Sequence, residues 1–211
     1  MHHHHQTQFD QKFWQDHWQE RPEHHNTPAA PHPYIQDETG HLTPGTALDA
    51  GCGRGAEARW LAAHGWRVTG ADISKTALDM ARDYEQPGFL PVEWIHADLT
   101  TWEPARQWDL VVTSYAHTPM PQLEFYRHIA RWVAPGGTLL IVAHLDDHGA
   151  DHQHPAEATV SVEDIKKLFA GPQWRIETAR SQTRQMGSEE HSMVLHDAII
   201  RIHHQLSPDG Q

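Results

Sequence analysis

The glycine-rich run LDAGCGRG at residues 48–55 constrains the fold of this chain more than any other feature. It ends a short apolar segment, 46–50, that is typical of a buried strand, and it stands directly before a helical stretch at about 54–64. Gly51 and Gly53 permit a tight turn and a close approach of a ligand to the backbone, and the helix N-terminus offers unpaired amide groups. The run therefore predicts a small polar ligand lying across a strand–turn–helix unit.

Short apolar segments and helical stretches continue to alternate after this run. The other expected strands are 67–71, 91–96, 108–114, 138–144, 173–182 and 191–203, and the helices expected between them are 74–85, 121–134 and 161–170. Such alternation predicts an α/β fold built on a parallel sheet. No helix separates the last two segments, so we expect them to pair antiparallel at one edge. The sequence therefore predicts a Rossmann-like, doubly wound sheet of seven mostly parallel strands with an antiparallel last strand.

The residues before this region divide into three parts. Residues 1–8 begin with MHHHH, which is either the remainder of a purification tag or a native histidine-rich start. Residues 9–20 carry four aromatic side chains at helical spacing (Phe9, Phe13, Trp14, Trp18), which predicts an amphipathic helix. Residues 21–44 are rich in proline and poor in apolar residues, and we expect an irregular connector there. The main domain is expected to span 45–211.

Composition narrows the class of partner. The formal charge of −12 argues against a nucleic-acid backbone, which usually meets a basic face. No apolar run approaches the roughly 18 residues of a membrane span. The single cysteine, Cys52, rules out an internal disulfide, and the N-terminus has no apolar stretch of signal-peptide length. We therefore expect a cytoplasmic protein that acts on a small-molecule substrate, without nucleic acid or membrane partners, as a monomer or homodimer.

The glycine run does not by itself name the ligand, because Gly51-x-Gly53-x-x-Ala56 also fits the G-x-G-x-x-G/A pattern of NAD-type folds. Three acidic residues separate the alternatives. Asp49, just before the glycines, favours a ligand with positive charge over a pyrophosphate. Asp72 ends the second strand, where a carboxylate can accept hydrogen bonds from both ribose hydroxyls. Asp98 follows the third strand, where it can meet an exocyclic amine such as that of adenine.

With these features the sequence resembles the class I S-adenosylmethionine-dependent methyltransferases over about residues 45–203. The markers are LDAGCGRG at 48–55, GADIS at 70–74, HADL at 96–99, WDLVVTSY at 108–115 and APGGTLLIV at 134–142. A finer resemblance is to the small-molecule branch that includes tellurite-resistance and thiopurine-type methyltransferases. Its cues are the Trp-bearing helix, GWRVTGADIS at 65–74, SYAHTP at 114–119 and AHLDD at 143–147. The histidine-rich loop 144–154 departs from these relatives, so no particular acceptor is inherited.

The resemblance implies S-adenosyl-L-methionine as the cofactor and methyl transfer, in EC class 2.1.1, to a sulfur, nitrogen, oxygen or metalloid atom. In that family the glycine turn meets the amino-acid part of the cofactor, the acid after the second strand holds the ribose, and the acid after the third meets the adenine. The candidate cofactor-binding residues are Trp14, Asp49, Gly51, Cys52, Gly53, Asp72, Ile73, Ala97, Asp98, Leu99 and Ser114. Among these, Cys52 is expected to be a small apolar residue of the turn and not a nucleophile.

Ser114, Tyr115 and His117 follow the fourth strand, where ligands of open α/β sheets lie. We take His117 as the candidate general base and Tyr115 as the group that orients the acceptor. The alternative for His117 is a side chain hydrogen-bonded at the loop edge. Trp14 and Trp18 either cover the cofactor or pack on the domain. Arg180 and Arg184 either bind an anionic acceptor or face solvent.

Two other classes of function remain open at this stage. An NAD(P)-dependent oxidoreductase is supported by the glycine spacing alone. A non-enzymatic, histidine-rich metal-binding protein on the same scaffold is suggested by the 21 histidines, several of them in the loop 144–154. We expect no metal site, because the loop fits no known ligand spacing and displacement at carbon needs no metal. We expect instead that protonation of His117 and this loop below about pH 6.5 changes acceptor binding.

Overall fold

The computed structural model describes residues 9–20, 28–85, 87–145, 160–188 and 191–206. The strands are β1 (Thr46–Ala50), β2 (Arg67–Asp72), β3 (Glu93–His96), β4 (Trp108–Ser114), β5 (Val133–His144), β6 (Trp174–Ser188) and β7 (His191–His204). The helices are α1 (Gln11–Gln19), α2 (Pro33–Thr39), α3 (Ala56–Ala63), α4 (Lys75–Asp83), α5 (Gln122–Ala130) and α6 (Val162–Leu168). The described part of the chain has no helix long and apolar enough to cross a membrane.

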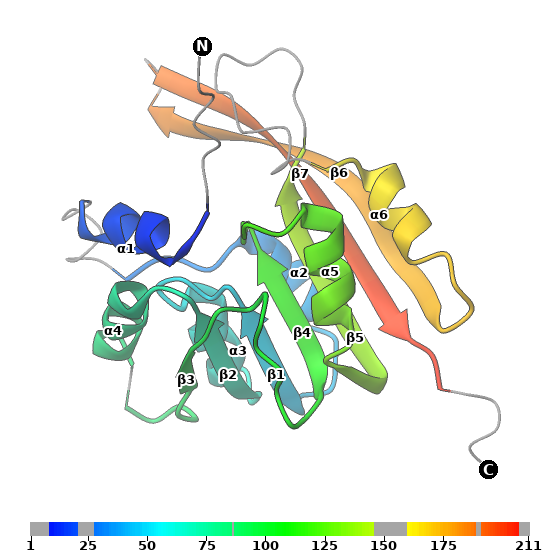
Figure 1. The fold of residues 1–211 in the computed structure, drawn as a ribbon, viewed down its shortest axis with the longest axis horizontal. Coiled ribbons are helices and arrows are strands. Elements are labelled where there is room, and N and C mark those ends of the chain that lie inside the picture. The colour runs from blue at the N-terminus through cyan, green and yellow to red at the C-terminus, as the bar shows by residue number, and fades with distance from the viewer. Residues whose placement is uncertain (1–8, 21–27, 86, 146–159, 189–190, 207–211) are drawn as a thin grey trace.

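The strands form one seven-stranded sheet in the order β3-β2-β1-β4-β5-β7-β6 (Figure 1). β1 to β5 pair parallel with one another, whereas β7 pairs antiparallel with both β5 and β6. The predicted mostly parallel sheet with an antiparallel last strand is therefore confirmed. The chain runs outward from β1 in one direction through β2 and β3, and in the other through β4 and β5. The carboxyl ends of β1 and β4 thus flank the topological switch point, where open α/β sheets bind ligands.

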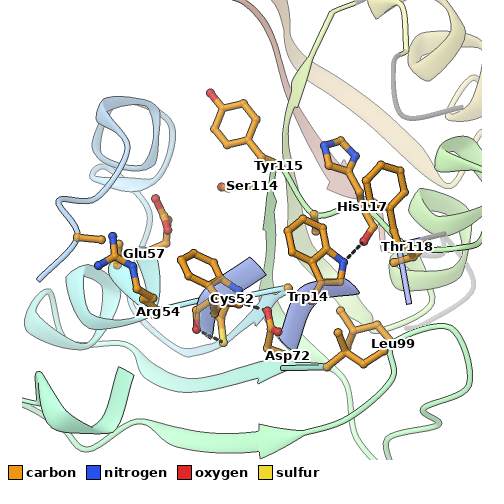
Figure 2. Close-up of a pocket in the computed structure, with 18 of the residues that line it drawn as sticks. Trp14, Cys52, Arg54, Glu57, Asp72, Leu99, Ser114, Tyr115, His117 and Thr118 are labelled. Atoms are coloured by element: carbon orange, nitrogen blue, oxygen red, sulfur yellow. Dashed lines mark hydrogen bonds between the residues drawn. The ribbon is translucent and has the colours of Figure 1, made fainter. Parts of the chain in front are cut away.

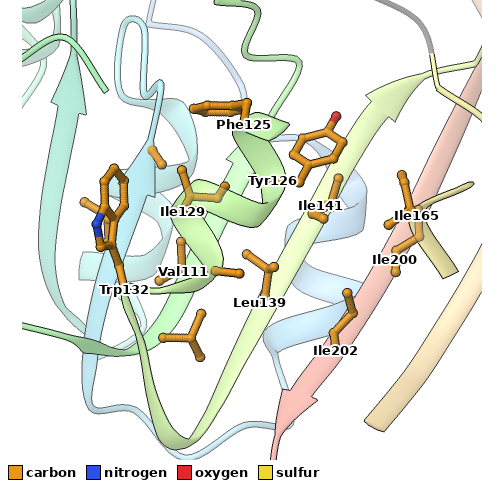
Figure 3. Packing of buried hydrophobic residues seen from close by; sticks show 14 of the residues in the cluster. Val111, Phe125, Tyr126, Ile129, Trp132, Leu139, Ile141, Ile165, Ile200 and Ile202 are labelled. Atoms are coloured by element: carbon orange, nitrogen blue, oxygen red, sulfur yellow. The ribbon is translucent and has the colours of Figure 1, made fainter. Parts of the chain in front are cut away.

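Helices cover both faces of the sheet because successive strand residues point to opposite sides. In β4, Val111 belongs to the core beneath α5 and α6, whereas Leu110 and Val112 belong to the core beneath α2 and α3. Figure 3 shows the first of these cores, in which Phe125 and Ile129 of α5 lie against the sheet. All five side chains are fully buried. The central strands therefore read as continuous apolar runs, as expected of strands covered on both faces.

Side chains start three of the helices. Asp10 accepts the amide of Phe13 at the start of α1, at 2.9 Å, and Ser74 accepts that of Ala77 at the start of α4, at 3.3 Å. Ser161 opens α6 by accepting the amide of Asp164 at 3.0 Å, as its sequence context predicts. These caps satisfy amides that helix geometry leaves without an internal partner.

The prediction of an irregular connector over 21–44 was wrong in part, because residues 33–39 form α2. Pro33 stands in its first turn, where the missing amide is no loss, and the helix ends at Gly40. Tyr34 and Ile35 are buried against the sheet face that α3 also covers. Seven residues among prolines are too few to show helical periodicity, so only the Pro and Gly at its two ends could have indicated this helix.

Candidate functional site

A cavity of about 310 Å³ opens at the carboxyl ends of β1, β2 and β4, beside α1 (Figure 2). The predicted cofactor-binding residues that line it are Trp14, Gly51, Cys52, Gly53, Asp72, Ile73, Asp98, Leu99 and Ser114. Both residues predicted on the acceptor side, Tyr115 and His117, line it as well. Ala97 and Asp49 are not on its wall. Trp18, which the sequence also suggested as a cover, lines the cavity, and the residues that sequence reasoning did not select include Phe9, Arg54 and Glu57.

The glycine turn has a left-handed backbone that glycine adopts readily. Gly51, Gly53 and Gly55 have φ of 81°, 50° and 71°. The amides of Gly51 and Cys52 both donate to the carbonyl of Ala71, at 2.9 and 3.1 Å, which fixes the turn to β2. Cys52 is buried, and burial raises the pKa of its thiol well above the usual range. This supports the prediction that Cys52 is an apolar residue of the turn.

Asp72 links the glycine turn to the end of β2. Its Oδ2 accepts the amide of Gly53 at 2.8 Å, and its Oδ1 accepts that of Ser74 at 2.8 Å. Burial raises the pKa of this carboxyl, and the backbone donors oppose that rise. Carboxylate oxygens have two acceptor sites each, so Asp72 keeps acceptor capacity toward the cavity that it lines.

Asp49 lies behind the glycine turn, with a side chain that is 1% exposed. Its Oδ2 accepts the amide of Ala58, in the first turn of α3, at 3.1 Å. Burial raises the pKa of Asp49 well above its usual range, and the negative charge of Glu57 raises it further. Direct contact between Asp49 and a ligand stays a prediction; in the structure its contact orients α3.

Arg54 and Glu57 add charge to the wall beside the glycine turn. The Arg54 guanidinium carbon lies 5.6 Å from the ring centre of Trp18, and Glu57 Oε1 accepts the amide of His32 at 2.9 Å. Burial raises the pKa of Glu57. Both residues stand in or directly after the glycine run, so their position in the sequence was the signal that could have found them.

Helix α1 lies beside the cavity opening, with Trp14 and Trp18 on the cavity wall. The Trp14 indole donates to the carbonyl of His117 at 3.1 Å (Figure 2), and Ser74 Oγ donates to Gln15 Oε1 at 3.3 Å. No residue of α1 is fully buried. Of the two roles that the sequence suggests for Trp14 and Trp18, these contacts favour a cover over the cavity and not burial in the core of the domain.

Tyr115 and His117 lie in the turn between β4 and α5. Tyr115 has a φ of 54°, in the left-handed region, and its hydroxyl lies 2.7 Å from His32 Nε2. His117 Nδ1 lies 3.4 Å from Gln122 Oε1, and its ring centre is 5.3 Å from that of Phe9. The structure thus brings the two predicted acceptor-side residues to one wall, with His32 as a partner that sequence reasoning missed.

The two arginines of β6 have different surroundings. Arg184 Nε donates to Asp197 Oδ2 at 2.7 Å and its Nη2 lies 3.4 Å from the Tyr115 hydroxyl. Arg180 Nη2 donates to Glu38 Oε1 at 3.2 Å, on α2. Arg184 therefore adjoins the cavity wall that carries Tyr115, whereas Arg180 contributes to the packing of α2 on the sheet.

Most residues of the two histidine-rich segments lie outside the part of the chain that the structure describes. Residues 1–8 and, of the loop 144–154, every residue after Leu145 lie outside the described residues. Among the residues described, no three His, Cys, Asp or Glu side chains gather into a candidate metal site.

One prediction concerns stability and pH. Burial, together with the charge of Arg184, lowers the pKa of His32 to about 4, against about 6.5 in an unfolded chain. The unfolded state therefore binds more protons between these values, and stability falls as pH falls from 6.5 to 4. We expect wild type to lose stability relative to H32Q across this window and to run parallel to it above pH 6.5, as measured by urea unfolding. Curves that stay parallel down to pH 4 would contradict the assignment.

The fold is shared with solved methyltransferases. The shared features are a mostly parallel sheet with an antiparallel last strand and helices on both of its faces. Residues 47–137, from β1 into β5, match the family model described as a methyltransferase domain.

The chain is also similar to individual proteins that are methyltransferases by name. A probable thiol methyltransferase of Arabidopsis thaliana is 34% identical over 110 residues, which cover 49% of this chain and 48% of that protein. The chain thus spans about half the length of this curated relative. Among solved structures, TehB from Haemophilus influenzae superposes with a TM-score of 0.69 and 17% identity, over 91% of this chain and 67% of that one. A magnesium protoporphyrin IX methyltransferase from Synechocystis PCC 6803 superposes with a TM-score of 0.64 and 16% identity, over 92% of this chain and 97% of that one.

Proposed function

We propose that this protein is an S-adenosylmethionine-dependent methyltransferase that acts on a small-molecule acceptor. The observation that carries the proposal is the charge of the cavity wall. Asp72, Asp98 and Glu57 line the cavity beside Arg54, so carboxylates outnumber the guanidinium there. Such a wall favours a cofactor with a sulfonium and an ammonium group over a pyrophosphate. The methyltransferase family match and the names of the relatives support the same conclusion.

The residues present fit this cofactor. Asp72 has acceptor capacity for ribose hydroxyls, and the glycine turn lets a ligand approach its backbone. Asp98 lies beyond β3 to meet the adenine; its Oδ1 already accepts the amide of Thr100 at 2.9 Å, which leaves Oδ2 for a ligand amine. When bound, the cofactor supplies an electrophilic methyl group on a sulfonium.

The chain's own contribution to methyl transfer is to hold the acceptor in line and keep water out. Ser114, Tyr115 and His117 form the wall on which the acceptor would lie, and Trp14 and Phe9 close it. His117 takes a proton from an acceptor that arrives protonated, and Tyr115 orients the acceptor. The acceptor atom is sulfur, nitrogen, oxygen or a metalloid. Because the Arabidopsis relative is named a probable thiol methyltransferase, thiols are the first acceptors to test.

Binding of S-adenosylhomocysteine is the direct test. We expect calorimetry to show one site per chain, because the cavity walls supply partners for ribose, adenine and amino-acid groups. The reduced nicotinamide cofactor serves as the matched control, and its fluorescence should not change when it is mixed with the protein. Absence of S-adenosylhomocysteine binding would overturn the proposal, and a nicotinamide signal would favour an oxidoreductase.

The acceptor is then sought by product formation. A panel of thiols, phenols, amines, selenite and tellurite is incubated with the cofactor, and S-adenosylhomocysteine is measured. A cytoplasmic location, the lack of a nucleic-acid partner and the choice between monomer and homodimer stay predictions.

A further inference from the structure

Tyr115 is the one non-glycine residue with a left-handed backbone in the part of the chain that the structure describes, with φ of 54°. Residues with a Cβ rarely adopt this conformation, and it persists only where surrounding contacts hold it. Tyr115 follows β4 directly and begins the turn that carries Ala116 and His117 along the cavity wall. The contacts that hold Tyr115 therefore also fix the acceptor side of the cavity.

Four contacts hold Tyr115 in place. Its amide donates to the carbonyl of Val142 at 2.9 Å, and its ring stacks on that of His144 with centres 4.3 Å apart. Its hydroxyl lies 2.7 Å from His32 Nε2 and 3.4 Å from Arg184 Nη2. These partners come from β5, from β6 and from the segment before α2, so no single element fixes the tyrosine.

The direction of the hydrogen bonds follows from the charges around Tyr115. Asp197 is fully buried and its pKa is lowered to about 2, so it is a carboxylate that holds Arg184 at 2.7 Å. Arg184 can only donate, so the tyrosine oxygen accepts from it. Two acceptors remain for the tyrosine hydrogen, His32 Nε2 and the Asp197 carboxylate, and the short 2.7 Å contact assigns it to His32. His32 can accept because it is neutral at physiological pH. The titratable and charged groups that face His32 are Tyr34, Glu57, Tyr115, His144, Arg184 and Asp197.

His32 also contacts the opposite wall of the cavity. Its amide donates to Glu57 Oε1 at 2.9 Å, in the first turn of α3 beside the glycine turn. Pro31 and Pro33 flank His32, and proline restricts both its own backbone and that of the residue before it. One residue thus joins two walls, through its main chain to Glu57 and through its imidazole to Tyr115, both of which appear in Figure 2.

We infer that His32 is a positioning residue for methyl transfer, whose imidazole orients the Tyr115 hydroxyl and so fixes the turn that carries His117. This inference rests on the proposed function. Because the contact with Glu57 uses the main chain, loss of the imidazole leaves the cofactor side of the cavity unchanged. Cofactor binding and acceptor alignment are therefore separable by substitution of His32.

Three substitutions of His32 test the inference. A glutamine amide reaches the place of Nε2, whereas an asparagine amide reaches only that of Nδ1. We expect H32A and H32N to keep the Kd for S-adenosylhomocysteine within about 3-fold of wild type while kcat falls about 10-fold or more, since small displacements of reacting groups have effects of this size. H32Q should recover most of the lost kcat. The matched control is H64A, on an exposed histidine whose ring stacks on Trp60 at the far end of α3.

The Tyr115 hydroxyl provides an independent arm. Y115F should lower kcat at least as much as H32A does, because it removes the contacts of the hydroxyl with both His32 and Arg184. The H32A/Y115F double variant should lose no more than Y115F alone, because the contact with His32 is already absent there. Nitrogen NMR of His32 gives a readout that needs no acceptor: we expect a neutral ring at pH 6 with Nε2 unprotonated.

Several outcomes would overturn the inference. They are an unchanged kcat in H32A, equal activity of H32Q and H32N, additive losses in the double variant, or a protonated Nε2. If H32A loses both S-adenosylhomocysteine binding and thermal stability, the role of His32 is purely structural. If wild type itself does not bind S-adenosylhomocysteine, the proposed function fails first, and this result is distinct from normal binding with an unaffected kcat.

Discussion

Replacement of Asp72 by alanine is expected to weaken S-adenosylhomocysteine binding about 100-fold or more. Hydrogen bonds to a charged group contribute about 1.5–3 kcal/mol each, and a ribose offers two hydroxyls to this carboxylate. Two such bonds amount to at least about 3 kcal/mol, which corresponds to about two powers of ten in Kd. The substitution also removes the acceptor of the Gly53 and Ser74 amides, so the glycine turn loses one of its contacts with the end of β2.

The measurement is calorimetric titration of wild type and D72A. The matched control is D79A, on an exposed acid of α4 that pairs with Lys75 and Arg82. D79A should bind as wild type does. Equal affinity of D72A and wild type, with D72A folded by circular dichroism, would remove Asp72 from the site and with it the main argument for a ribose there.

Substitution of Gly51 by alanine is expected to have the second large effect. An added Cβ would stand 2.5 Å from the Cβ of Ala116, and Gly51 has a φ of 81°. The left-handed backbone costs about 1–2 kcal/mol for an L side chain, and overpacking adds about 1–3 kcal/mol. We expect the free energy of unfolding of G51A to fall by about 3 kcal/mol. Because Ala116 belongs to the turn with Tyr115 and His117, ligand binding should weaken as well.

Gly88 separates the two causes of this effect. Its φ of 97° is also left-handed, but an added Cβ would meet nothing within 4 Å. G88A should therefore lose only the backbone contribution, about 1–2 kcal/mol, and keep its affinity for S-adenosylhomocysteine. Urea unfolding of both variants measures the difference. Equal losses in G51A and G88A would show that the close approach of Ala116 has no energetic weight.

Most of the fold could be predicted from local patterns in the sequence. The positions of strands and helices along the chain follow from apolar runs and from residues such as Ser161 and the glycines after β1, whose roles are set by near neighbours. The cofactor wall was predicted for the same reason, because Asp72 and Asp98 each stand at a strand end. The connector was less accessible: α2 is stabilised by packing of Tyr34 and Ile35 on a sheet that forms elsewhere in the chain.

The parts of the site that could not be predicted depend on contacts between distant segments. His32 and Tyr115 are 83 residues apart, and no periodicity links them. Asp197 lies in β7 within an apolar run, and only the pairing of β7 with β5 and β6 brings it to Arg184. Asp49 illustrates the converse, because its place in the motif was evident whereas the direction of its carboxylate, toward α3, was not.

The order of strands in the sheet has a consequence for synthesis on the ribosome. β7 leaves the ribosome after β6 yet lies between β5 and β6, so neither of those strands has its partner at that edge until β7 emerges. A nascent chain that has reached β6 therefore presents the edge of β5 to other chains, a known route to aggregation. Asp197, which anchors Arg184, arrives with the same strand. The strands that precede Gly51 and carry Asp72 can thus pair before β7 emerges, whereas the surroundings of Tyr115 are completed last.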